Sequence, residues 1–174
     1  MQTLRRLYAR LRLRVNEAKS AVARPHDRKF LGYSFWVAKG REIRRRVAPK
    51  ALAAMKERVR KITTQNGGMS MDRVIAELRS YLTGWKAYFR LAETPRVFRD
   101  LDEWIRHRLR LVQLKQWKRG KTVYREMRAR GVRPDLAARV AGNTRSWWRN
   151  ASMAIHVALP TSCYDRAGVP RLAG

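Results

Sequence analysis

The sequence predicts a mainly α-helical protein that carries short β-strands near its amino terminus. Through residues 49–118, apolar residues recur three and four positions apart, which is typical of amphipathic helices. Upstream, apolar and basic residues alternate instead, which is typical of half-buried strands. We therefore expect three parts: residues 1–48 with a β-hairpin, residues 49–118 as a helical bundle, and residues 119–174 as a small, basic helical module.

The amino-terminal part contains one predicted helix and three predicted strands. Residues 3–10 have leucines at helical spacing, and residues 11–15 alternate leucine or valine with arginine, which predicts a half-buried strand. Residues 30–37 and 43–47 alternate in the same way. The turn signal at residues 38–41 joins these last two strands into a β-hairpin, and its second strand is rich in arginine.

The middle part is predicted to be a bundle of three helices. The helical period begins at Pro49, and the first helix is expected to end near Asn66. Ser70 is a suitable N-cap for the second helix. Thr94 and Pro95 predict the start of the third, because proline is favoured in the first helical turn. Each helix has one apolar stripe and the connections are short, so an antiparallel bundle follows.

The carboxy-terminal part has a weaker pattern. Thr122 is expected to cap a short helix that runs to Arg130, and Pro134 to start another that runs to about Val140. Residues 153–159 form a further apolar segment, followed by a tail rich in proline and glycine. We expect this end of the chain to be loosely built and to become ordered only in context.

The charge of the chain indicates a nucleic-acid partner. There are 41 Lys and Arg against 13 Asp and Glu, which gives a net charge of +28 and a pI of about 11.7. Solubility needs a net charge of only about 2–8 in magnitude. Self-repulsion at +28 opposes compaction unless a polyanion neutralises it. RNA or DNA is therefore the expected partner.

Several other classes of protein do not fit this composition. No run of about 18 apolar residues occurs, so we expect no contact with a membrane. Cys163 is the single cysteine, which excludes an internal disulfide and indicates a cytoplasmic location. One cysteine and three scattered histidines do not match a usual zinc site, so neither a metal nor a cofactor is predicted.

No catalytic residue is predicted. Nucleotide polymerisation needs carboxylates that hold two metal ions about 3.5–4 Å apart. Asp100, Asp102 and Glu103 are the one acidic cluster in the sequence, and helical spacing favours pairing with nearby arginines. No Tyr-x-Asp-Asp motif occurs. We therefore expect the chain not to be an enzyme on its own.

The predicted nucleic-acid contacts are cations that meet phosphates and tryptophans that stack on bases. They are Lys19, Lys29, Arg44, Arg45, Arg46, Lys50, Arg106, Arg108, Arg110, Lys115, Trp117, Lys118, Arg119, Lys121, Trp147 and Trp148. His107, set among arginines, is interpreted as a further backbone contact or a solvated side chain. For Trp85 and Trp104, helical spacing favours a place in the core.

Several motifs in the same order resemble one family, the group II intron reverse transcriptases or maturases. LxLxVNxxKSxV at residues 11–22 and KFLGYxF at residues 29–35 resemble the end of the family's palm. SYLTGWKAYF at residues 80–89 resembles the signature of its maturase-specific domain. The segments that also fit are residues 91–110, 115–122 and 168–172.

The resemblance implies a fold and a function. The bundle corresponds to the thumb, or domain X, which grips intron RNA and the template–primer duplex, and the carboxy-terminal module helps to bind DNA. The primer-grip-like residues are Phe30, Leu31, Gly32 and Tyr33. We expect a maturase-type fragment that binds group II intron RNA and assists splicing and retrohoming of a mobile element. Fingers, most of the palm and its catalytic aspartates have no counterpart in this sequence.

Three alternatives stay open. The chain is a carboxy-terminal piece of a split or truncated reverse transcriptase that works with a separate fingers–palm part. Alternatively, it is a non-functional remnant, whose uncovered palm face predicts aggregation. A general basic DNA-binding protein is the third, and DNA or an RNA–DNA duplex stays open as an additional partner of the leading interpretation.

Overall fold

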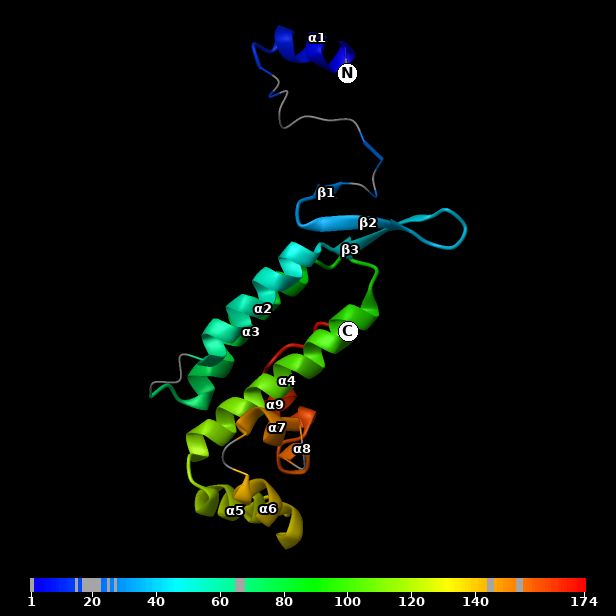
Figure 1. The fold of residues 1–174 in the computed structure, drawn as a ribbon. Coiled ribbons are helices and arrows are strands. Elements are labelled where there is room, and N and C mark those ends of the chain that lie inside the picture. Colours follow the sequence, from blue (N-terminus) through cyan, green and yellow to red (C-terminus); the bar gives the residue numbers. More distant parts are fainter. Residues whose placement is uncertain are drawn as a thin grey trace.

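The computed structural model describes residues 2–14, 16, 23–24, 26, 28–64, 68–143, 146–152 and 155–174. A small antiparallel sheet lies at one end of a bundle of long helices, and short helices lie at the other end (Figure 1). The prediction of a mainly α-helical fold with short strands near the amino terminus is confirmed.

The β-hairpin is present with the expected turn. Strands β2 (Tyr33–Val37) and β3 (Ile43–Val47) pair antiparallel, with Phe35 opposite Arg45. A third, very short strand, β1 (Lys29–Phe30), pairs antiparallel with β2, so that the strand order is β1-β2-β3. Strand β3 is therefore an edge strand, and its arginines lie at the border of the sheet.

The strand expected over residues 30–37 is interrupted. Leu31 and Gly32 have φ angles of +49° and +77°, and the chain turns at these two residues. A non-glycine residue at positive φ is uncommon and does not fit a regular strand. The alternating pattern is continuous in the sequence, but the backbone forms two strands, β1 and β2, that are separated by a tight turn at these residues.

Helix α1 (Gln2–Arg10) agrees with the leucine spacing, but the strand expected at residues 11–15 is wrong for the described residues 11–14. The amides of Leu11 and Leu13 donate back to carbonyls of α1, and the two side chains are 66% and 56% exposed. Alternation gives a strand only where a neighbouring strand takes up the backbone hydrogen bonds. Val15 lies outside the described residues.

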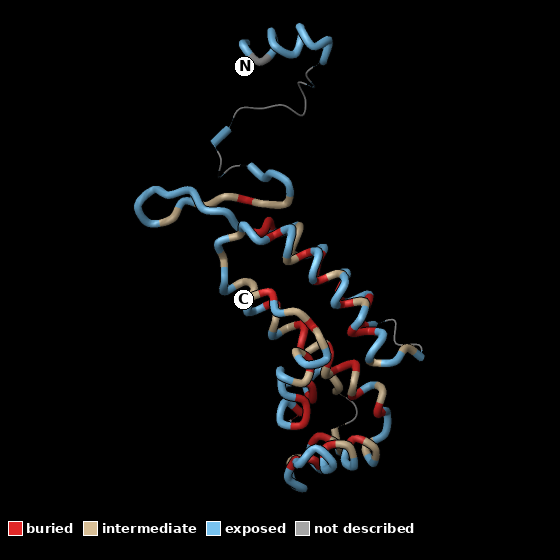
Figure 2. Tube along the Cα trace, turned by 180° about the vertical axis from the view of Figure 1, so that it is seen from behind, coloured by how far each residue is buried: buried red, intermediate tan, exposed pale blue. Residues whose placement is uncertain are grey.

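Three helices form the bundle: α2 (Pro49–Thr64), α3 (Met71–Tyr88) and α4 (Pro95–Trp117). The Ser70 side chain accepts a hydrogen bond from the amide of Arg73, so the predicted N-cap is confirmed. Buried positions recur along the helices (Figure 2), and they include Met55, Val59, Ile62, Val74, Leu78, Leu82, Leu101, Ile105 and Leu109. Fully burying one such side chain contributes about 1.5–3 kcal/mol.

In the described residues after the bundle there are five short helices: α5 (Gly120–Ala129), α6 (Pro134–Gly142), α7 (Trp147–Ser152), α8 (Ile155–Ala158) and α9 (Thr161–Arg166). Helices α5 and α6 pack on each other beyond the end of α4 (Figure 1), and α7 packs on α4. Helix α5 begins at Gly120, so Thr122 lies inside the helix and is not its cap.

The tail after α9 is not loosely built. It runs between α3 and α4, where Arg79 of α3 donates to the carbonyls of Ala167 and Gly168. Lys86 donates to the carbonyl of Arg171 about two helical turns further along α3. The tail side chains of Val169 and Leu172 are 2% and 4% exposed and join the core. The expectation of an end ordered only in context is therefore wrong.

A buried arginine on α4 holds the other side of this tail. Arg106 is 1% exposed, and its guanidinium donates to Asp102 at 3.1 Å and to Asp165 at 2.9 Å. The same guanidinium also donates to the carbonyls of Val169 and Pro170, both at 3.3 Å. The network therefore joins α4, α9 and the tail.

The two carboxylates of this network have further partners. Asp102 accepts hydrogen bonds from the amides of Leu172 and Ala173 at 2.9–3.0 Å. The pKa of Asp165 lies below its usual value, mainly because Arg171 donates to it and also because Arg106 does. Each charged group of the network thus has an oppositely charged neighbour, as a buried arginine requires.

We expect Asp102→Ala to lower the free energy of unfolding by about 3–5 kcal/mol, because it removes one charged partner of a buried cation and the acceptor of two tail amides. Asp100→Ala is the matched control: Asp100 is exposed on the same helix, and a change below about 0.5 kcal/mol is expected. Urea unfolding followed by circular dichroism measures both. Equal losses in the two variants would contradict the role given to Asp102.

Candidate nucleic-acid interface

Four cations surround the end of α4 and the start of α5. We call Lys115, Lys118, Arg119 and Lys121 the α4–α5 corner. All four side chains are exposed, and within the described part of the chain none is paired with a carboxylate. Lys118 ends α4 with a φ of +57°, and Arg119 is the N-cap of α5, so the change of direction between the helices brings the cations together.

The α4–α5 corner adjoins a hollow in the surface. A cavity of about 380 Å³ is lined by Lys115 and Lys118 together with the loop residues 68–70 that precede α3. Gln116 donates to the carbonyl of Met69 at 3.1 Å and holds this loop against α4. A concave surface with two unpaired ammonium groups suits an anionic ligand such as a phosphodiester backbone.

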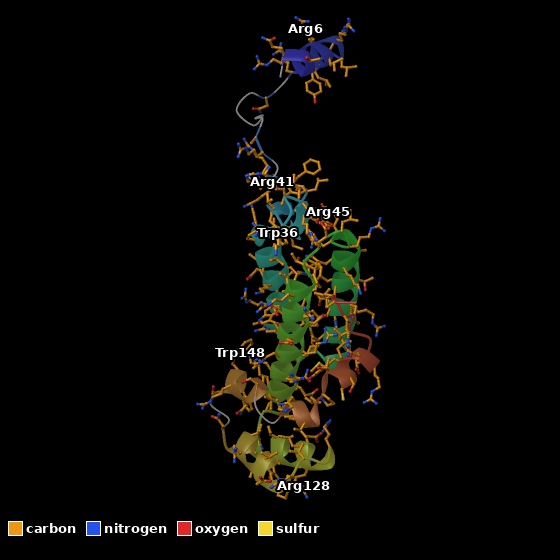
Figure 3. All side chains as sticks on the ribbon, turned by 90° about the vertical axis from the view of Figure 1, so that its right-hand side faces the viewer. Arg6, Trp36, Arg41, Arg45, Arg128 and Trp148 are labelled. Atoms are coloured by element: carbon orange, nitrogen blue, oxygen red, sulfur yellow. The ribbon has the colours of Figure 1, made fainter. Side chains whose placement is uncertain are left out.

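A second group of exposed cations lies on the sheet. Arg44, Arg45 and Arg46 of β3 are exposed, and Lys29 and Lys50 flank them as exposed side chains without a carboxylate partner in the described residues. Figure 3 shows Arg45 and Arg41 at this end of the molecule. The expected basic hairpin is therefore a surface feature.

The arginines of β3 are partly held by neighbours. Arg44 donates to Glu42 at 3.1 Å, and Arg46 donates to Ser34 at 3.2 Å. Arg45 is tied to Glu93, which accepts from the Arg45 amide at 2.8 Å and from its guanidinium at 3.3 Å. The backbone hydrogen bond from Arg45 is the largest cause of the lowered pKa of Glu93. These contacts fix the strand edge beside the start of α4.

The three arginines expected to contact phosphates from α4 have mainly structural contacts. Arg106 is buried, so the prediction of a surface contact is wrong for it. Arg108 is partly buried and donates to the Thr63 hydroxyl at 2.6 Å, which joins α4 to α2. Arg110 donates to the carbonyl of Leu159 at 3.0 Å, which joins α4 to the segment after α8. Burial lowers the pKa of both partly buried guanidinium groups.

The tryptophans have separate roles. Trp117 is only 8% exposed, and Arg130 lies over its ring at 5.1 Å, so the expected stacking on bases does not fit this side chain. Trp85 is 8% exposed, which confirms its expected place in the core. Trp104 is partly buried, with the charged ends of Lys56 and Arg60 at 5.8 and 5.7 Å from its ring centre.

The adjacent tryptophans of α7 differ in exposure. Trp147 is partly buried and packs against the core, whereas Trp148 is 48% exposed. The rings of Trp148 and His107 lie with centroids 3.9 Å apart and an interplanar angle of 48°. His107 is therefore a partly buried packing partner of Trp148. Sequence reasoning missed this contact, because no spacing rule relates α4 to α7.

The primer-grip-like segment is a rigid, exposed turn. Phe30 and Leu31 are 66% and 65% exposed. The Tyr33 hydroxyl donates to the carbonyl of Tyr88 at 2.6 Å, and the Tyr88 hydroxyl donates to the carbonyl of Leu31 at 3.0 Å. At Gly32 an added Cβ would lie 3.2 Å from the ring of Phe89, so glycine allows both the positive φ and the close approach. These contacts hold the turn on the end of α3.

Lys19, the remaining predicted contact, lies outside the described residues. Among the described residues, no cluster of His, Cys, Asp and Glu has the arrangement needed to hold a metal ion. Within the same residues, no helix combines the length and the apolar character needed to cross a membrane.

Comparison with known proteins identifies the middle of the chain. Residues 52–131 match the family model described as the group II intron, maturase-specific domain. This match fits a carboxy-terminal part of a group II intron maturase or reverse transcriptase and confirms the resemblance found in the sequence motifs. A search of curated proteins found no match. The matched range contains α2 from its fourth residue, α3, α4, α5 and the whole α4–α5 corner.

We expect the free energy of unfolding to decrease as the pH falls, because His107 becomes protonated. Burial is the largest cause that lowers its pKa from 6.5, and the charges of Arg110 and Arg108 act in the same direction. A lowered folded-state pKa contributes stability above pH about 6.5 that is lost as the pH falls, by at most about 1.4 kcal/mol per pH unit. Thermal unfolding of the wild type and His107→Gln between pH 8 and 5 measures this. The variant should lose less on acidification, and identical pH responses would contradict the assignment.

Proposed function

Because residues 52–131 carry a group II intron maturase-specific domain, we propose that the chain is a maturase-type protein that binds group II intron RNA and assists its splicing. The observation that carries this proposal is the α4–α5 corner inside the matched range, with four exposed cations and no acid paired with them in the described residues. Lys29, Arg44, Arg45, Arg46 and Lys50 on the hairpin are proposed as additional phosphate contacts.

The physical basis is counterion release. Lysine and arginine that neutralise phosphates free the ions condensed on the nucleic acid, and the gain depends on the salt concentration. A structured intron packs many phosphates together, so a basic protein that neutralises them lowers their repulsion and favours the compact, spliceable RNA. Helix α4 orients the cations of the corner, because Arg106, Arg108 and Arg110 anchor it to the tail, α2 and the segment after α8.

The proposed role needs no catalytic group from the protein. Asp102 of the one acidic cluster in the sequence is already engaged with Arg106 and two tail amides. We therefore propose that the chain assists RNA without being an enzyme on its own. Contacts with DNA or an RNA–DNA duplex would use the same cations, because phosphate contacts do not read sequence.

Replacing Lys118, Arg119 and Lys121 together by Gln should weaken binding of a structured group II intron RNA and reduce its salt dependence. Each phosphate contact contributes about 0.7–0.9 to the magnitude of the slope of log K against log salt concentration. Removing three contacts should therefore reduce the magnitude of this slope by about 2–3. The charge-matched control replaces Arg6, Arg10 and Arg12, which are exposed in or directly after α1 and lie outside the matched range. Its slope should change less.

An unrelated RNA of equal length completes this titration. Stronger binding of the wild type to the intron than to the unrelated RNA is the expected result for a maturase. Equal binding that depends steeply on salt would contradict a maturase role and leave only general electrostatic attraction. If the triple variant has unchanged affinity and an unchanged slope, the α4–α5 corner is not part of the RNA interface.

A second candidate function is supported by where apolar surface is exposed. Most large hydrophobic side chains that are exposed in the described residues precede the bundle: Leu7, Tyr8, Leu11, Leu13, Phe30, Leu31, Val37 and Ile43. Such a concentration indicates a surface that another polypeptide covers. We propose as the alternative that residues 1–48 join a separate fingers–palm part of a reverse transcriptase.

Primer extension tests the alternative. A fingers–palm polypeptide of a group II intron reverse transcriptase is assayed with and without this chain, and extension that needs both is expected. Phe30→Ser combined with Leu31→Ser should reduce the gain several-fold, because both side chains are about two-thirds exposed and do not stabilise the isolated chain. No gain with the partner would reject this function, and aggregation of the purified chain alone would favour the remnant interpretation.

A further inference from the structure

Trp148 leaves an unusually large apolar surface in water. All six tryptophans lie in the described part of the chain, and Trp148 has the largest exposed fraction, 48%. An indole is among the largest apolar side chains, and exposing it gives up part of the free energy that burial would supply. Tryptophan is enriched where a ring is covered by a binding partner. The exposed indole of Trp148 is therefore a candidate contact for a binding partner.

The indole is held on a fixed support. The ring of His107 lies 3.9 Å from that of Trp148, between centroids, and α7 packs along α4. Asn150, fully buried two residues later, donates to the carbonyls of Val140 at 3.1 Å and Asn143 at 2.7 Å. Ala151 is also fully buried. Helix α7, where Figure 3 labels Trp148, is therefore anchored by its buried residues, while the indole contacts His107 and stays 48% exposed.

The charge around Trp148 selects the chemistry of the occupant. Residues 136–164 contain no Asp or Glu. Arg149, the next residue of α7, is exposed, and within the described residues it is not paired with an acid. An exposed indole beside an unpaired cation matches an unpaired nucleobase and its phosphate, because bases stack on aromatic rings while cations contact the backbone. A protein partner would need an acidic border around its apolar contact.

We propose that Trp148, supported by His107, is a stacking platform for an unpaired base of a bound nucleic-acid strand. This inference rests on the proposed binding of nucleic acid and adds that the protein recognises single-stranded segments as well as phosphates. Stacking on the exposed face of an indole uses no hydrogen bond to the edge of a base. Binding at this position is therefore tolerant of sequence, as stacking on a flat ring generally is.

The test compares a single-stranded RNA of mixed sequence with a blunt RNA duplex of the same length, using the full chain. Trp148→Ala should weaken binding of the single strand about 5- to 150-fold, which corresponds to about 1–3 kcal/mol of stacking. Affinity for the duplex should change less than about twofold, since paired bases are not available for stacking. The salt slope for the single strand should not change, because no cation is removed. Single-stranded DNA should respond as single-stranded RNA does.

Two variants control for chemistry and folding. Trp148→Phe keeps an aromatic ring and should retain most of the affinity for the single strand. Val157→Ala truncates an apolar side chain of similar exposure, 49%, and should not affect either probe. Photo-crosslinking of the wild type to a strand containing 5-iodouridine does not depend on any variant. The crosslink is expected at Trp148.

Each failure has a distinct meaning. An equal loss for single strand and duplex in Trp148→Ala, no loss at all, or crosslinks only at other residues would overturn the platform. If the wild type binds the duplex and Lys118→Gln, Arg119→Gln and Lys121→Gln weaken it, the proposed phosphate contacts of the α4–α5 corner stand even when the platform fails, and preference for the intron RNA then decides the proposed function. If the wild type binds neither probe, the proposed function fails and the platform fails with it.

Discussion

The buried guanidinium of Arg106 is the constraint on which much of the described structure depends. A cation that is 1% exposed has lost its water shell, and arginine does not release its proton in proteins. Carboxylates must therefore accompany it, and Asp102 and Asp165 do so at 3.1 and 2.9 Å. Carbonyls of Val169 and Pro170 also accept hydrogen bonds from it. Since these partners come from α4, α9 and the tail, satisfying one cation fixes the end of the chain.

The scarcity of acids decides which cations stay available. Several of the carboxylates that the structure describes pair where elements meet: Glu77 pairs with Arg58 between α3 and α2, and Glu93 pairs with Arg45 beside the sheet. Glu126 pairs with two arginines in and after α5. Acids placed at these joints are not available to neutralise the α4–α5 corner. A net charge of +28 therefore stays concentrated on open surfaces, where a polyanion reduces the repulsion.

Exposed apolar surface occurs in two settings that call for different occupants. In residues 1–48 it is spread over a helix, a turn and the hairpin, and Phe30 and Leu31 are held rigidly on the end of α3. An extended apolar surface of this kind suits another polypeptide. Trp148 is instead a single ring in a stretch without acids, supported by His107, and that setting suits a base.

The sequence by itself determined the local structure and the overall charge. Helical periods, the Ser70 cap and Pro95 predicted the three long helices, the turn at residues 38–41 predicted the hairpin, and the motifs near residues 80–89 indicated the family. These features depend on neighbours within a few residues, so they can be read from spacing. The lack of acids near Lys118 in the sequence also predicted that this cation is exposed.

Only the tertiary structure decided which of the basic and aromatic side chains face solvent. Arg106 and Lys115 look alike in the sequence, yet Arg106 meets Asp165, which is 59 residues away, and is buried. Trp117 and Trp148 differ for the same reason, because packing with distant helices covers one and leaves the other open. The strand expected at residues 11–15 lacked a partner for its backbone in the described residues. Burial and pairing depend on contacts between distant segments, which local spacing does not specify.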